Sequence, residues 1–199
     1  MQPIYSESSY KIEARKMNVD IYRRLTGRHS IPEGRGYWTL CNYQGREPGS
    51  EIVQMCEAGL LGKKQFHGVD RDEDIILKNK ECHAEANWYT GDWTEVTGDA
   101  ENFNPSLIYL DTTCFADHWV AADILSKTMM ICQTDTVLLA NVMLNDPRSR
   151  KQFDADQLIK NIVRLVPALE LGKWSPTVEN FTYSTTGRTF FKTYALYKP

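Results

Sequence analysis

The stretch that decides the fold is YWTLCNYQGREPGSEIVQMCEAGLLGKKQFHGVD, residues 37–70. Its apolar run at 37–42 predicts a strand, Ser50 to Leu61 predicts an amphipathic helix, and 66–70 predicts a second short strand ending on Asp70. A strand, a helix and a strand form a βαβ unit with parallel strands and a right-handed crossover. We therefore expect the loop after the first strand and Asp70 to meet at one sheet edge, where a ribose and an adenine fit.

Composition sets the broad class of the protein. The chain has 199 residues, 42% of them hydrophobic, which suits one domain. A net charge of −3 gives no global positive field of the kind that attracts nucleic acid. The five cysteines are dispersed and the histidines lack metal-ligand spacing, so we expect a reducing compartment and no metal site. Because no signal sequence or long apolar run is present, we expect a cytoplasmic protein without membrane contact.

Residues 1–35 are interpreted as a helical lead-in to a domain that spans 36–199. Ser9 to Leu25 predicts an imperfect amphipathic helix, and the Gly- and Pro-containing stretch 26–36 predicts an irregular connection. Residues 1–36 carry seven Lys and Arg against four Asp and Glu. This basic surplus could bind a nucleic acid, and an ordinary solvated helix surface is the commoner alternative.

Beyond residue 70, predicted helices and strands continue to alternate. Helices are expected at 73–83, 117–132 and 154–169, and strands at 87–90, 105–111 and 136–144. The last two strands, 178–185 and 189–197, are joined by so short a connection that only an antiparallel hairpin fits. The sequence therefore predicts an α/β fold. Its sheet is Rossmann-like, mostly parallel and seven-stranded, with helices on both faces and a C-terminal antiparallel hairpin.

This order of elements resembles the class I S-adenosylmethionine-dependent methyltransferases over about residues 36–199. In that family a glycine-containing loop after the first strand approaches the methionine part of the cofactor. Here the loop holds Gly45 and Gly49, and Asn42 stands where an acid is usual. The resemblance implies that Asn42, Gly45 and Gly49 contact S-adenosylmethionine, and that Gly49-Ser50 caps a helix whose first N–H groups stay free. An ordinary strand-to-helix turn is the alternative.

Two further acids match positions that bind the nucleoside in that family. The resemblance implies that Asp70 accepts hydrogen bonds from the two ribose hydroxyls, since a carboxylate can accept both. It also implies that Asp92 accepts from the adenine amino group while Trp93 offers a stacking face. Asp70 also fits a nicotinamide dinucleotide, with a helix N-cap as the alternative, and the stretch 91–93 suits a turn beside a core tryptophan.

The segment 111–115 lies where the family places its substrate-facing loop. Threonines stand in place of the two prolines typical of nucleic-acid amino methyltransferases, so the sequence does not favour that route. Asp111 is expected to orient an acceptor, and His118 offers a possible base. Cys114 suits the thiolate addition used to methylate carbon 5 of a pyrimidine, although a buried, incidental cysteine is the commoner state.

Three functional hypotheses follow from these residues. The first is an S-adenosylmethionine-dependent methyltransferase acting by direct displacement, with a nucleic acid among its possible acceptors. The second is a non-catalytic methyltransferase-like module that binds a partner, because the loop is poor in glycine and the prolines are missing. The third, a nicotinamide-dependent oxidoreductase, is disfavoured because the chain has neither G-x-G-x-x-G after its first strand nor a suitable Tyr-x-x-x-Lys pair.

Overall fold

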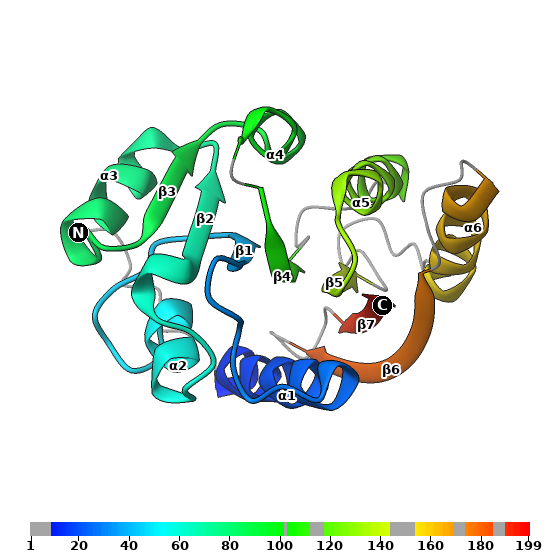
Figure 1. Cartoon of the computed structure of the whole chain (residues 1–199), viewed down its shortest axis with the longest axis horizontal. Helices are drawn as coiled ribbons and strands as arrows, with labels where there is room; N and C mark the ends of the chain where they lie inside the picture. The colour runs from blue at the N-terminus through cyan, green and yellow to red at the C-terminus, as the bar shows by residue number, and fades with distance from the viewer. Residues whose placement is uncertain (1–8, 102, 112–117, 144–153, 169–173, 185–189) are drawn as a thin grey trace.

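The computed structural model describes residues 9–101, 103–111, 118–143, 154–168, 174–184 and 190–199 (Figure 1). Its strands are β1 (Gly36–Leu40), β2 (Phe66–Asp70), β3 (Asn87–Thr90), β4 (Pro105–Asp111), β5 (Thr136–Met143), β6 (Ser175–Ser184) and β7 (Phe190–Lys198). Its α-helices are α1 (Ser9–Thr26), α2 (Glu51–Glu57), α3 (Glu73–Cys82), α4 (Trp93–Asp99), α5 (His118–Ile131) and α6 (Ala155–Ala168), and a 3-10 turn spans Lys63–Gln65.

The strands form one sheet in the order β3-β2-β1-β4-β5-β7-β6. Strands β1 to β5 pair in parallel, and β7 lies antiparallel between β5 and β6. This confirms the predicted seven-stranded, mostly parallel sheet with its C-terminal hairpin. Because the chain runs outward from β1 to β3 and then returns to β4 on the other side of β1, the strand order reverses between β1 and β4.

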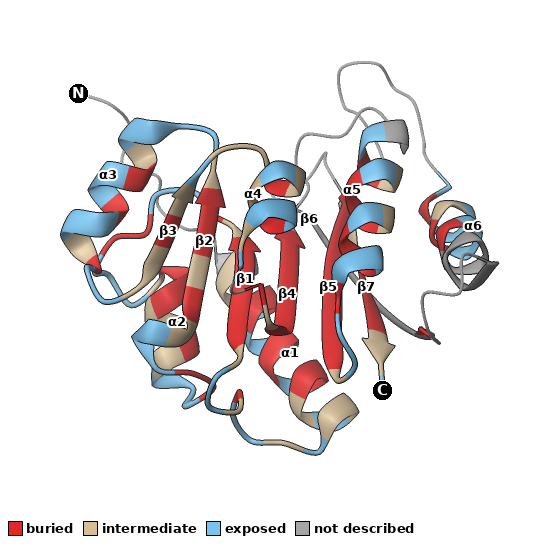
Figure 2. Ribbon diagram, turned by 45° about the horizontal axis from the view of Figure 1, so that its top comes forward, coloured by how far each residue is buried: buried red, intermediate tan, exposed pale blue. Residues whose placement is uncertain are grey.

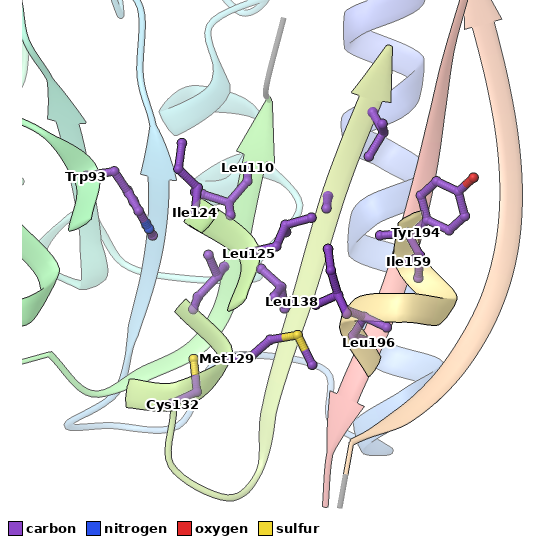
Figure 3. Packing of buried hydrophobic residues seen from close by; sticks show 14 of the residues in the cluster. Trp93, Leu110, Ile124, Leu125, Met129, Cys132, Leu138, Ile159, Tyr194 and Leu196 are labelled. Atoms are coloured by element: carbon purple, nitrogen blue, oxygen red, sulfur yellow. The ribbon is translucent and has the colours of Figure 1, made fainter. Parts of the chain in front are cut away.

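Buried side chains form two clusters, one on each face of the sheet. Trp38, Ile108 and Leu138 belong to the cluster under α4, α5 and α6, part of which Figure 3 shows. Their neighbours in sequence, such as Tyr37 and Leu107, belong to the cluster under α1, α2 and α3. Adjacent residues of a strand point to opposite faces, so each strand serves both clusters. Figure 1 shows α4 and α5 on one side of the sheet and α1 and α2 on the other, as predicted.

Helix α1 is joined to the body of the protein by buried polar contacts. Arg15 pairs with Glu51 of α2 at 3.5 Å, with both side chains almost wholly buried, and Glu51 also accepts from the Tyr37 hydroxyl of β1. The Tyr22 hydroxyl lies 2.8 Å from that of Ser106 in β4. Because a lone buried charge is costly, each of these groups needs its partner. The helical lead-in is therefore part of the same core as the sheet.

The helices differ from the prediction in two places. Helix α2 ends at Glu57 rather than near Leu61, because Gly59 adopts a φ of +67°, a left-handed conformation that ends helices. Helix α4 was not predicted, and Asp92 caps its N-terminus. Strands β2, β3 and β4 have the predicted bounds. In the part of the chain that the structure describes, no helix is both long and apolar enough to cross a membrane.

Exposure follows position in the sheet. Figure 2 shows β1, β4 and β5 as almost wholly buried, whereas the outward faces of α3 and α5 are exposed. The rings of Trp38, His67 and Tyr89, which come from β1, β2 and β3, lie nearly parallel to one another. The His67 ring stacks on Trp38 at 4.2 Å between centroids, and Tyr89 stacks on Trp38 at 5.2 Å. Burial lowers the pKa of His67 to about 4.

We expect His67 to make folding stability depend on pH. Its pKa is about 4 in the folded chain and about 6.5 when unfolded. Between these values the unfolded chain binds more protons, so stability rises with pH by at most about 1.4 kcal/mol per pH unit from this residue. The replacement His67→Phe keeps a ring on Trp38 and removes the titration. Urea unfolding across this pH range should give a flatter profile for the variant, and parallel profiles would contradict the expectation.

Candidate functional site

Three acids lie at the same edge of the sheet. Asp70 is the last residue of β2, Asp92 follows β3, and Asp111 is the last residue of β4. Since these strands are parallel neighbours around β1, their carboxyl ends share one edge. The Gly91 N–H donates to the Asp70 carbonyl at 2.9 Å and ties the ends of β2 and β3 together. The site is thus built on rigid strand ends.

Asp70 is not the N-cap of the helix that follows it. That role belongs to Asp72, whose carboxylate accepts from the N–H groups of Asp74 and Ile75 at 2.9 and 3.3 Å. The Asp70 carboxylate accepts from the Asp72 N–H at 2.9 Å and is half-buried. Burial is the main cause that raises the pKa of Asp70. Its carboxylate therefore lies at the strand end without a helix-capping role.

Asp92 uses both carboxylate oxygens. One oxygen accepts from the N–H and the hydroxyl of Thr94, at 2.9 and 2.8 Å, and so caps α4. The other oxygen pairs with the guanidinium of Arg71. The bond from Arg71 is the main cause that lowers the pKa of Asp92 to about 2. Asp92 is therefore a carboxylate held in place from two sides, with about a quarter of its side chain exposed.

The expected stacking role of Trp93 is wrong for this structure. Trp93 is only 2% exposed and lies in the core between α4 and α5 (Figure 3). Its indole N–H donates to the Thr128 hydroxyl of α5 at 2.8 Å. As the first residue of a helix, the side chain turns toward α5 instead of the sheet edge. The alternative of a turn beside a core tryptophan is the correct one.

The loop between β1 and α2 is held by side chains. The Gln44 side-chain oxygen accepts from the N–H groups of Glu51 and Ile52, at 2.8 and 3.4 Å. Asn79 of α3 accepts from the Gln44 N–H at 2.6 Å, and His83 lies 2.7 Å from the Gly45 carbonyl. The first N–H groups of α2 are therefore occupied. This corrects the expectation that a cap after Gly49 leaves them free.

The three loop residues expected at a cofactor have different surroundings. Asn42 is exposed just beyond β1, and its carbonyl accepts from Asn79 at 3.2 Å. Gly45 is buried, and a Cβ there would collide with the carboxylate of Glu47. The Gly49 carbonyl accepts from Arg15 at 2.9 Å. Gly45 and Gly49 therefore pack against protein groups, whereas Asn42 has an exposed side chain.

Asp111 belongs to a row of polar side chains that crosses three strands. In register, Asp111 of β4 lies opposite Asn141 of β5, and Asn141 lies opposite Thr193 of β7. The Thr193 hydroxyl donates to the Asn141 oxygen. The Asn141 amide donates to the Tyr109 hydroxyl at 2.5 Å and to Asp111 at 3.4 Å. Lys11 of α1 pairs with Asp111 at 3.4 Å. This row had no signal in the sequence.

The remaining candidate groups lie partly outside the described residues. Cys114 falls in 112–117, which the structure does not describe. His118 begins α5, but its side chain is not among those described. Their catalytic roles stay predictions.

A cavity of about 280 Å³ lies between α1 and α2, and none of the three acids lines it. Arg15 and Arg23 line it, together with Gln54, Met55 and Ala58. Both arginines donate to backbone carbonyls, Arg15 to that of Gly49 and Arg23 to that of Ala58 at 2.6 Å. The cavity therefore belongs to the packing of α1 on α2.

The basic surplus of residues 1–36 is largely paired within the protein. Four of its seven Lys and Arg side chains lie in ion pairs with acids. These pairs are Lys11–Asp111, Arg15–Glu51, Arg28–Asp135 and Arg35–Asp135. A charge already paired has less to offer a phosphate. The nucleic-acid partner stays a prediction.

Comparison by sequence gives no match to any family model or curated protein. Comparison by structure gives many. Trm5b from Pyrococcus abyssi is 10% identical with a TM-score of 0.61, covering 96% of this chain and 49% of Trm5b. This chain thus spans about half the length of Trm5b. The glycopeptide N-methyltransferase MtfA complexed with S-adenosylmethionine is 8% identical with a TM-score of 0.59, covering all of both chains.

A putative rRNA-methylase from Clostridium thermocellum is also similar, 9% identical with a TM-score of 0.54, covering 90% of this chain and 94% of the other. At such low identity the comparisons establish the fold alone. The chain has the class I methyltransferase fold.

Replacing Asn141 should destabilise the protein. Asn141 is fully buried, and Asn141→Leu removes the hydrogen bonds that Asn141 makes with Asp111 and with the buried Thr193 hydroxyl. We expect a loss of about 2 to 3 kcal/mol in the free energy of unfolding, because unsatisfied buried groups cost that much. Chemical denaturation is the measurement. Thr193→Val in the same background should cost less than it does alone, and fully additive losses would show that the two residues are not coupled.

Proposed function

We propose that this chain binds S-adenosylmethionine at the carboxyl ends of β2, β3 and β4 and transfers its methyl group to an acceptor. The observation that supports this most is the arrangement of Asp70, Asp92 and Asp111 along one edge of a class I methyltransferase fold. MtfA, which shares the fold, has been solved with S-adenosylmethionine and with sinefungin. The cofactor supplies a methyl group on a positively charged sulfur.

The two acceptor groups suit the nucleoside part of the cofactor. Asp70 presents a half-buried carboxylate at the strand end, and a carboxylate is the group that accepts from two neighbouring hydroxyls. Asp92, beyond the end of the next strand, is an acceptor suited to an amino group. Asp70 is not needed as a helix cap, because Asp72 caps α3, and Asp92 caps α4 through only one of its two carboxylate oxygens. These two acids fit a ribose and an adenine.

The loop after β1 fits the methionine part less well. Gln44 occupies the N–H groups at the start of α2, and Gly45 faces Glu47. The exposed side chain of Asn42 is the group of this loop that we propose for the cofactor. This difference favours the second candidate function, a non-catalytic module that keeps the fold and binds a partner.

Asp111 is proposed to face the acceptor. Its carboxylate is held between Lys11 of α1 and Asn141 of β5, so its direction is fixed before any ligand arrives. A carboxylate in that position accepts from an N–H or O–H group and orients the attacking lone pair. Nucleic acid is one acceptor to test.

We expect the wild-type chain to bind S-adenosylhomocysteine, the demethylated product, in titration calorimetry. Asp70→Ala should weaken binding by about tenfold or more, because each hydrogen bond to a charged group contributes about 1.5 to 3 kcal/mol. Asp20→Ala is the matched control, since Asp20 is an exposed acid on α1. Absence of binding to the wild-type chain would remove the proposal.

A methyl-transfer assay distinguishes the enzyme from the non-catalytic module. Radiolabelled S-adenosylmethionine should transfer its methyl group to total RNA, to peptides or to a small-molecule extract, and Asp111→Asn should reduce this transfer by at least about tenfold. The variant should still bind S-adenosylhomocysteine. Binding of the cofactor without transfer to any of these acceptors would favour the module.

A further inference from the structure

A base bound beside Asp92 needs a flat group to cover it, and Trp93 is not available. Its ring is in the core, hydrogen-bonded to α5. The planar group that does lie beside Asp92 is the guanidinium of Arg71, the residue that follows Asp70. Arg71 is 77% exposed at the sheet edge. Arg71 is therefore next to Asp70 in sequence and next to Asp92 in space.

We propose that Arg71 supplies the flat face that covers the base of the nucleoside ligand, and that Asp92 holds the guanidinium beside the site until the ligand binds. The proposal rests on the proposed function, because it takes the nucleoside to lie between Asp70 and Asp92. Guanidinium groups stack on aromatic faces, and arginine is common wherever a planar cation is needed. Arg71 thus takes the position that the sequence suggests for Trp93.

The direction of the effect follows from the sizes of two contributions. Base binding at Asp92 competes with the Arg71–Asp92 ion pair, but such an exposed pair changes an equilibrium by about fivefold at most. Stacking of a base on an aromatic side chain changes affinity by about five- to hundredfold, and a desolvated cation–π contact of an arginine changes it by about thirtyfold. Stacking is therefore the larger contribution. Removing Arg71 should weaken binding overall.

The contacts of Asp92 allow Arg71 to pair with Asp92 before the ligand binds and to cover the base afterwards. The oxygen that accepts from Thr94 stays bound to the start of α4, so the carboxylate keeps its place when the ion pair opens. The other oxygen can then accept from the ligand, while the long side chain of Arg71 swings over the ring. Both residues act on the same ligand without rearrangement of the backbone.

Titration calorimetry with S-adenosylhomocysteine tests the proposal. Arg71→Ala should weaken binding by about five- to twentyfold, and Arg71→Lys should weaken it nearly as much because an ammonium has no flat face. Arg24→Ala, the same replacement at an exposed position on α1, is the control and should bind as the wild type does. The thermal midpoints should be unchanged, since Arg71 is exposed.

An analogue with purine in place of adenine separates stacking from the contact at Asp92, because it keeps the ring and lacks the amino group. If Arg71 covers the ring, Arg71→Ala weakens binding of both ligands by the same factor. Asp92→Asn, which retains a residue suited to cap α4, should instead change the ratio of the two affinities. A change in this ratio for Arg71→Ala would show that Arg71 acts only through Asp92 and would overturn the proposal.

The remaining outcomes also test the role of Arg71. Tighter binding by Arg71→Ala would show that the ion pair merely competes with the ligand, and unchanged binding would show that Arg71 is not in contact with it. Either result overturns the role of Arg71 and leaves the proposed function intact. Failure of the wild-type chain to bind S-adenosylhomocysteine would instead remove the proposed function itself.

Discussion

The parallel pairing of β1 with both β2 and β4 is the constraint on which the site depends. Parallel neighbours need right-handed crossovers. Each crossover takes the chain from the carboxyl edge of the sheet back to the opposite edge, where the next parallel strand begins. The residue at the end of each strand is consequently placed beside its counterparts, however far apart they lie in sequence. Asp70, Asp92 and Asp111 are brought together in this way.

The same constraint explains what could be predicted from the sequence. A buried strand that ends on an acid, such as 105–111, is visible as an apolar run followed by Asp111. The alternation of such runs with amphipathic segments gives the parallel sheet, and the short connection near residue 187 gives the hairpin. Burial and periodicity are properties of single segments, so the fold can be predicted without knowing any contact between segments.

The rest depends on contacts between segments. Helix α4 has only seven residues and contains Gly98, so it shows too little periodicity to be predicted, and the direction of Trp93 depends on that helix. The polar row of Asn141 and Thr193 exists only because β7 lies in register beside β5. The role of Gln44 cannot be predicted from the sequence, because glycines, rather than a side-chain amide, are the usual signal of such a loop.

The side-chain closure of the β1–α2 loop has a consequence for how this chain can evolve. In a glycine turn each glycine adopts its conformation independently of other side chains. Gln44, in contrast, is hydrogen-bonded both to Asn79 and to the N–H groups at the start of α2. Replacing either side chain alone leaves buried partners without a hydrogen bond, and only a joint replacement restores them. Substitutions in this loop and in α3 should therefore be strongly epistatic, and a change to a glycine loop would have to pass through a less stable intermediate sequence.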